Sequence, residues 1–190
     1  MFKNNTAAYV STGKPKVGGA IFSAPVGTTL PADATTALND AFVCMGYASQ
    51  DGLVNGYSSE SSETAAWGGD IVDTSKTKQT DTWKYTAIEA LNINVLKGVY
   101  GDDNVTGDLK TGITIKATAA QADPRAYVFD MVLKGGALKR VVLPNASFAG
   151  IEDVTYKDNT QIGYAITLSA LPDSTGTTHY EYIVDPNAAD

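Results

Sequence analysis

Few residues of this chain have the types and spacing that catalysis requires. The chain has one histidine, His179, and one cysteine, Cys44. A Ser-His-Asp site needs a nucleophile held on a sharp turn, and the sequence contains no GxSxG segment. A dyad of Cys44 and His179 is disfavoured because Cys44 lies in the apolar run FVCMGY, which predicts a buried thiol. We therefore predict that the chain is not an enzyme.

Candidate metal and phosphate ligands are equally sparse. One histidine and one cysteine cannot form a structural zinc site. The acidic turns Asp102-Asp103-Asn104 and Asp158-Asn159 offer oxygen ligands for calcium, although neither fits an EF-hand loop and such residues commonly serve turn geometry. Gly68-Gly69 and Gly135-Gly136 lack the Lys and Ser/Thr of a phosphate loop. We expect no cofactor, and calcium at the acidic turns stays an open alternative.

Length and charge narrow the class of protein further. The 190 residues favour one domain that is large enough to bury a core. A net charge of −7 argues against a basic patch that grips nucleic acid. The polar opening MFKNNTAAYVSTGKPK lacks a secretory h-region, so synthesis in the cytoplasm is expected. No apolar run approaches the roughly 20 residues that span a bilayer, so no membrane partner is expected.

Most of the chain shows the patterns of β-strands, so strands must position any functional surface. Alternating or β-rich runs predict strands over 17–24, 41–49, 76–87, 112–118, 126–134, 137–143, 150–157, 161–171 and 177–184. Gly135-Gly136 and Asp158-Asn159 each separate two such runs, which predicts two hairpins. Eight or nine strands beside one short helix indicate a sandwich or barrel.

One helix is predicted near residues 92–100. Leu91, Val95, Leu96, Val99 and Tyr100 recur at helical spacing, with Asn92 as N-cap and Gly101 after the last turn. A helix of about two turns does not persist alone, so we expect it to pack on a sheet.

Two regions read as irregular. Residues 1–16 predict an arm that is ordered only when a neighbour holds it. Residues 50–79 are polar and broken by glycines, which predicts a long loop, and long loops inside compact domains are usually functional. Trp67 in this loop is interpreted as an interface anchor, with a core position under the loop as the alternative. Trp83, in contrast, is expected to fill the core.

Four segments together resemble the major tail tube proteins of long-tailed, siphovirus-type bacteriophages. They are GYASQDG at 46–52, AWGGDIV at 66–72, IEALNINVLKGVYGDDNV at 88–105 and VTYKDNTQIGYAITLSALPD at 154–173, within a resemblance that covers residues 41–185. The resemblance implies a mainly β protein with a β-sandwich or barrel-like tail-tube fold, one short flanking α-helix, a long loop and terminal arms. The expected organisation is an N-terminal arm (1–16), a sandwich domain (17–185) with an inter-ring loop (53–79), and a C-terminal tail (186–190).

The same resemblance implies the function and the partners. Six copies form a ring, and stacked rings form a tube that delivers the genome into the host. The expected partners are further copies of the chain together with the tape measure, tail terminator and tail-tip proteins, and DNA passes through the lumen without specific binding. The protein is expected in the virion tail after synthesis in the host cytoplasm. The inter-ring contact is expected to involve Leu53, Tyr57, Trp67, Gly68, Gly69 and Asp70.

A channel for DNA should carry few cations on its wall, because basic side chains bind phosphates. Small polar side chains on the solvated faces of two strands suit such a wall. Alternation separates Thr80, Thr82, Lys84 and Thr86 from Asp81, Trp83, Tyr85 and Ala87 in the first strand, and it gathers Ala165, Thr167 and Ser169 on one face of the second. We therefore predict that the lumen is lined by Thr80, Thr82, Thr86, Thr167 and Ser169. Lys84 shares this face, so a neighbouring carboxylate should offset it or it should point away. The alternative function is a carbohydrate-binding or adhesin β-sandwich, which the ten tyrosines keep open.

Overall fold

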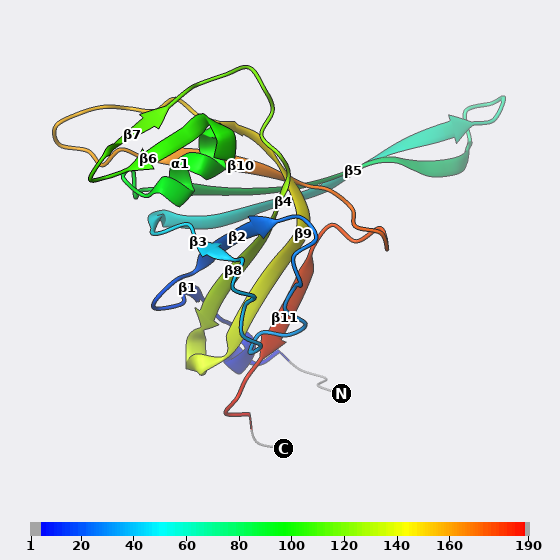
Figure 1. Cartoon of the computed structure of the whole chain (residues 1–190). Helices are drawn as coiled ribbons and strands as arrows, with labels where there is room; N and C mark the ends of the chain where they lie inside the picture. Colours follow the sequence, from blue (N-terminus) through cyan, green and yellow to red (C-terminus); the bar gives the residue numbers. More distant parts are fainter. Residues whose placement is uncertain (1–4, 189–190) are drawn as a thin grey trace.

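The computed structural model describes residues 5–188 and is built mainly from antiparallel strands (Figure 1). The strands are β1 (Gly13–Pro15), β2 (Ile21–Pro25), β3 (Val43–Cys44), β4 (Ala48–Ala65), β5 (Ile71–Ala87), β6 (Val105–Asp108), β7 (Gly112–Ile115), β8 (Arg125–Leu133), β9 (Leu138–Ile151), β10 (Tyr164–Ala170) and β11 (Tyr180–Val184). The helices are α1 (Ile93–Tyr100) and three 3₁₀ turns, η1 (Ala7–Tyr9), η2 (Asp102–Asn104) and η3 (Lys134–Gly136). The mainly β class with one short α-helix is confirmed.

The long strand β9 joins two halves of one sheet. Its first part, Leu138–Val142, pairs with β8 on one side and β11 on the other, and residues 146–151 pair with β10. The order β3-β2-β8-β9-β10-β5-β4 therefore runs from one half of the fold to the other through β9. Side chains of both halves meet in the main core, where the Trp83 ring of β5 stacks on the Phe129 ring of β8 at 5.7 Å. This arrangement is a sandwich, and the core position expected for Trp83 is confirmed.

A second, smaller core lies on the other face of β2, β8 and β9. Val128, Val142 and Phe42 are buried there, and Leu30 and Leu38 of the connection between β2 and β3 pack against them. This long connection therefore covers a sheet face although it holds no strand or helix of its own.

Helix α1 begins and ends where its cap residues predict. The Asn92 side chain accepts a hydrogen bond from the Asn94 backbone amide at 2.9 Å, and Gly101 follows with φ 93°. Val95, Leu96 and Val99 are buried in the main core, as the helical spacing predicts. Leu91 differs from that prediction, because it lies before the helix and its side chain is 69% exposed.

Replacing Leu96 with Ala should lower the free energy of unfolding by about 3 kcal/mol, because it leaves a cavity in the core. Chemical denaturation measures the change. Leu91→Ala is the matched control, and its exposed side chain predicts a change within about 0.5 kcal/mol. Equal effects of the two variants would contradict the packing of α1.

Residues 53–79 do not form the irregular loop that their polar sequence predicts. β4 and β5 pair over most of this stretch, from Leu53 opposite Tyr85 to Ala65 opposite Ile71, and only residues 66–70 lie between them. The prediction failed because a two-stranded ribbon in solvent satisfies its backbone hydrogen bonds across the pair. It therefore needs no apolar alternation, the signal on which strand prediction rests.

The structure differs from two further predictions. The hairpin around Asp158-Asn159 has shorter strands than predicted: β9 ends at Ile151, β10 starts at Tyr164, and only a Lys157–Thr160 bridge marks the turn. In the predicted N-terminal arm, β1 pairs with the end of β8, so the chain's own sheet holds this part. The hairpin at Gly135-Gly136 joins β8 to β9 as predicted. Among residues 5–188, no helix has the length and apolarity needed to cross a membrane.

Candidate assembly surfaces

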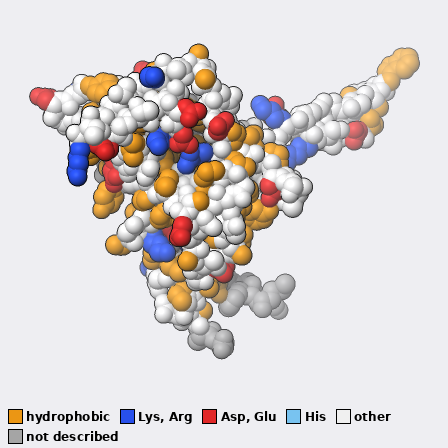
Figure 2. Space-filling view, in the orientation of Figure 1, with side chains coloured by type: hydrophobic (Ala, Val, Ile, Leu, Met, Phe, Trp, Pro, Cys, Tyr) orange, Lys and Arg blue, Asp and Glu red, His pale blue; other side chains and the backbone are white. Residues whose placement is uncertain are grey.

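The β4–β5 ribbon projects from the body as a long arm (Figure 1). Residues 60–78, which we call the arm, are exposed throughout. Figure 2 shows hydrophobic side chains at its far end. The fully exposed Trp67 and the exposed Ile71 and Val72 lie at or next to this end. A ribbon with an apolar end and no packing of its own is typical of a segment that binds a partner.

The end of the arm is a tight turn. The Ala66 amide donates to the Asp70 carbonyl at 2.8 Å, and the Gly69 amide donates to the Ala66 carbonyl at 3.0 Å. Gly68 and Gly69 have φ of 125° and 98°, a conformation that residues with a Cβ rarely adopt. The turn thus presents Trp67 in a fixed setting, and four of the predicted contact residues lie together here: Trp67, Gly68, Gly69 and Asp70. Leu53 and Tyr57 lie nearer the body, where Leu53 is half-buried against the main core.

A buried carboxylate fixes the root of the arm. The Asp81 side chain is fully buried, and it accepts hydrogen bonds from Thr178 Oγ1 at 2.6 Å and from Asn55 Nδ2 at 2.9 Å. The His179 Nδ1 atom lies 2.6 Å from Asp81 Oδ2, and its ring packs edge-on against Trp83 and Tyr57. This cluster ties β4, β5 and the segment before β11 together where the arm begins. The single histidine therefore has a structural partner, which its sequence position did not indicate.

The same contacts shift the pKa of Asp81. Burial raises the pKa of the carboxyl group, but the hydrogen bonds from Thr178, His179 and Asn55 lower it by more, so the net pKa lies below the ordinary 3.8. A carboxyl group with a lowered folded-state pKa stabilises the fold above its unfolded pKa. That stabilisation disappears as the pH falls through the folded-state pKa.

Asp81→Asn should lower the free energy of unfolding by about 1–3 kcal/mol at pH 7, because an amide cannot replace both acceptor oxygens. The difference from wild type should shrink as the pH falls from the unfolded-state pKa of about 4 through the lower folded-state pKa of the carboxyl group. Denaturation curves over pH 2–7 measure both effects. Asp73→Asn, in the exposed part of the arm, is the control and should change stability little at any pH. A pH-independent deficit in Asp81→Asn would contradict the assigned role of the charge.

A second surface is the solvated face of the strands β9, β10, β5 and β4. The alternation predicted for β5 is confirmed: Asp81, Trp83, Tyr85 and Ala87 are buried, and their neighbours point outward. Across the pairs, Thr82 lies opposite Ser169 and Gly56, and Lys84 lies opposite Thr167 and Val54. We call this set the small-residue face: Val54, Gly56, Ser58, Thr80, Thr82, Lys84, Thr86, Ser147, Gly150, Ala165, Thr167 and Ser169.

Close packing on this face depends on small residues. A Cβ at Gly56 would lie 2.7 Å from Thr82 Oγ1, and that hydroxyl donates to the Gly56 carbonyl at 3.3 Å. The five residues predicted to line a lumen, Thr80, Thr82, Thr86, Thr167 and Ser169, share this face and none is buried in the core. These five side chains give the face a small, polar and uncharged surface.

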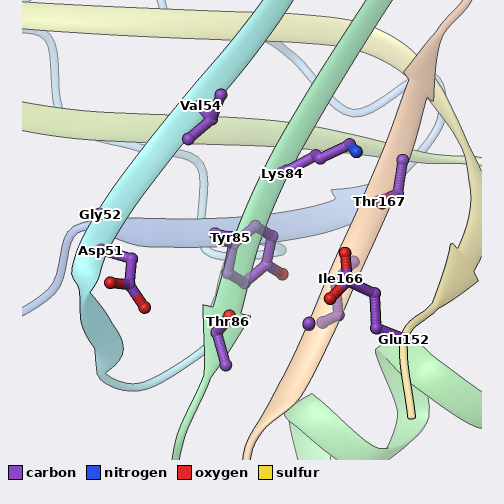
Figure 3. A pocket seen from close by; sticks show the side chains of 10 residues that line it. Asp51, Gly52, Val54, Lys84, Tyr85, Thr86, Glu152, Ile166 and Thr167 are labelled. Carbon is purple, nitrogen blue, oxygen red and sulfur yellow. The ribbon is translucent and has the colours of Figure 1, made fainter.

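Lys84 is the one charged residue of the small-residue face. It borders a shallow hollow of about 120 Å³ that Asp51 and Glu152 also line (Figure 3). Two carboxylates and one ammonium leave this hollow with a net negative charge at neutral pH. Lys84 forms no ion pair with either carboxylate within the described residues, so the predicted offset of its charge stays a prediction.

The candidate chemical sites of the sequence do not converge. Asp102 forms an ion pair with Arg125 at 2.6 Å. Within the described residues, no group of three or more His, Cys, Asp or Glu side chains is arranged to hold a metal ion. Cys44 is half-buried in β3, whereas His179 is engaged by Asp81.

Comparison with known proteins agrees with a role in assembly. The family model described as "Phage tail tube protein" matches residues 4–189, nearly the whole chain. A search of curated proteins found no match.

Proposed function

Because this chain belongs to the phage tail tube protein family, we propose that six copies close into a ring and that stacked rings form the conduit for the genome. Membership makes the chain a structural subunit of the virion tail that assembles with itself and other tail proteins. The family is a structural one and not a family of enzymes. It favours this role over the glycan-binding alternative.

The small-residue face is the observation that carries the proposal. A channel wall must let a dense polyanion slide past, and cations on it would hold DNA by releasing counterions. On this face, hydroxyl, glycine and alanine positions and Val54 surround one lysine, and Asp51 and Glu152 line the same hollow as that lysine. We place Thr80, Thr82, Thr86, Thr167 and Ser169 on the lumen wall for this reason.

Two strand edges support closure of a ring. β4 is the last strand of the sheet, and residues 147–151 of β9 pair with β10 alone. Unpaired backbone groups at such edges are templates for another strand. Pairing β4 of one copy with β9 of the next continues the sheet around a ring, and closure removes both edges.

The arm supports stacking of rings. It extends along β4 and β5 beyond the body, so it reaches past the ring to which its own subunit belongs. We assign Trp67, Gly68, Gly69 and Asp70 to the inter-ring contact, with Tyr57 near the arm's root and Leu53 supporting it from the core. The tape measure, tail terminator and tail-tip proteins are the further partners expected at the inside and ends of such a tube.

Electron microscopy of the purified protein at high concentration tests the proposal. We expect rings or tubes, and a reconstruction with sixfold symmetry whose channel is lined by Thr82, Thr167 and Ser169. A protein that stays monomeric at all concentrations and with tail initiation proteins present would refute ring formation. Tubes with the small-residue face on the outside would refute the lumen assignment alone.

A further inference from the structure

A cavity of about 450 Å³ lies beside the end of α1. Its volume falls within the range of about 300–1,000 Å³ that is usual for binding pockets. Its lining comes from the last turn of α1, η2, the segment 120–125, and β8 and β9. Its apolar lining residues are the partly exposed Phe148 and Ala122 and the buried Tyr127 and Ala146. Its exposed members include Asp102, Asp103 and Asp123.

Arg125 lines this cavity and has one donor without a partner. Its Nη1 donates to Asp102 at 2.6 Å, and its side chain is only 16% exposed. Its Nε is buried and has no hydrogen-bond partner within residues 5–188. Buried donors are nearly always paired, so the guanidinium of Arg125 is under-satisfied in the subunit alone.

The turn at the end of the arm carries groups that suit the lining of this cavity. Trp67 offers a large apolar ring whose only polar atom is an N–H donor, which suits a pocket with an apolar side and carboxylates around it. Ala65, Ala66, Gly68 and Gly69 flank the ring with minimal bulk, so the turn can approach closely. The carbonyl groups of that turn are acceptors that a guanidinium can use.

The occupant cannot be the arm of the same chain. The arm leaves from the start of β5, whereas α1 follows the other end of that strand after residues 88–92, and Figure 1 shows the two on opposite sides of the molecule. The 11 residues of β5 from Ile71 to Asp81 span about 35 Å as a strand and lead away from the side that carries α1 (Figure 1). Because the arm and the cavity lie on opposite sides of the subunit, a contact between them in two copies is head-to-tail and can repeat without limit.

We propose that Trp67 of one copy inserts into the α1-side cavity of a second copy in the adjacent ring. This inference rests on the proposed stacking function and names the surface that receives the arm. The indole ring packs on Phe148, and the glycine turn lies beside the guanidinium of Arg125.

Disulfide trapping tests the contact. In a Cys44→Ser background, which removes the one native thiol, the double variant Ala66→Cys/Ala122→Cys keeps Trp67 and places thiols at the turn and in the cavity. Oxidation of assembled protein should give a ladder of covalent multimers, because each copy donates and receives one contact. Each single variant should give no ladder, and a mixture of the two should give dimers only. The pair Ala66→Cys/Val17→Cys, with Val17 fully exposed elsewhere, is the matched control and should give no ladder.

Fluorescence provides a second measurement that leaves the arm unchanged. Trp83 is already buried in the monomer, so a shift of emission to shorter wavelength on assembly reports burial of Trp67. Ala122→Phe should fill the cavity and abolish both the shift and the tubes, whereas Ala122→Ser should retain them. Tubes that form without the ladder and without the shift overturn this inference and leave ring stacking intact. Protein that never assembles overturns both proposals.

Discussion

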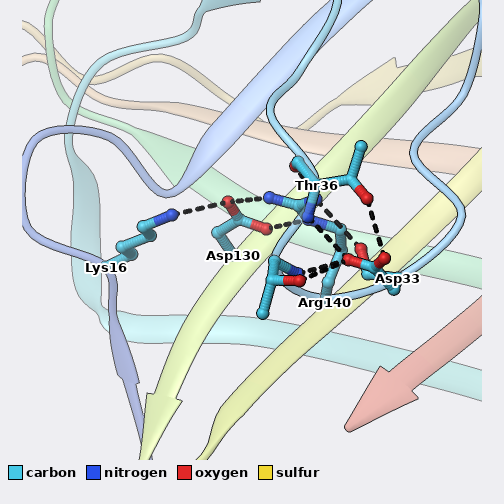
Figure 4. A network of polar contacts seen from close by, with 6 residues as sticks. Lys16, Asp33, Thr36, Asp130 and Arg140 are labelled. Carbon is cyan, nitrogen blue, oxygen red and sulfur yellow. Dashed lines mark hydrogen bonds and ion pairs between the residues drawn. The ribbon is translucent and has the colours of Figure 1, made fainter. Parts of the chain in front are cut away.

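Replacing Arg140 with Met should lower the free energy of unfolding by about 3–5 kcal/mol, because the buried Asp130 carboxylate loses its bidentate partner. Arg140 on β9 is 2% exposed and pairs across the sheet with Asp130 on β8. Its Nε and Nη2 donate to the two Asp130 carboxylate oxygens at 2.6 and 2.8 Å, a bidentate geometry (Figure 4). Chemical denaturation of the monomer measures the change.

The same guanidinium also holds the connection between β2 and β3. Its Nη1 donates to the carbonyl groups of Asp33 at 3.0 Å and Thr36 at 2.6 Å, and Lys16 approaches Asp130 at 3.6 Å (Figure 4). We therefore expect Arg140→Met to expose this connection to proteases under native conditions as well. Limited proteolysis followed by mass spectrometry of the cut sites measures that second effect.

Two variants separate the charge from the packing. In Arg140→Met/Asp130→Leu both charges are removed, so most of the lost stability should return. Lys139→Met removes a neighbouring cation whose partner Glu181 is partly exposed, and it should cost less than about 1 kcal/mol. An Arg140→Met variant no less stable than Lys139→Met would contradict the assignment of Arg140 as a buried anchor.

Removing the arm should abolish tubes and leave the subunit folded. Ser59 and Gln79 are cross-strand partners, so an Asn-Gly turn placed between them in exchange for residues 60–78 closes a shorter ribbon. The replaced residues are all exposed, which predicts a small change in the stability of the monomer. Electron microscopy and size-exclusion chromatography should show rings or monomers in place of tubes.

Both strands must be shortened together in this design, because deleting residues from β4 alone leaves β5 with an unpaired edge. Replacing the exposed arm residues Glu60 and Glu63 with Gln keeps its length and is the matched control; those tubes should persist. Normal tubes from the shortened chain would show that rings stack through some other surface.

The sequence by itself determined the elements that have a strong local signal. The alternation in β5 and β10 separated inward from outward side chains correctly, because one face of each strand must enter a core. Asn92, Gly101 and the spacing of Val95, Leu96 and Val99 located α1 for a similarly local reason. The four quoted segments also led to the family that the match over residues 4–189 shows.

The tertiary structure decided what depends on partners far away in the chain. Asp81 and His179 lie 98 positions apart, and Arg140 binds carbonyl groups more than 100 positions before it. No local pattern announces such pairs, because a buried charge is tolerated only where the fold supplies its partner. The arm likewise depends on the pairing of β4 with β5. The polar residues of each strand alone predict a loop, and the pairing makes them a ribbon.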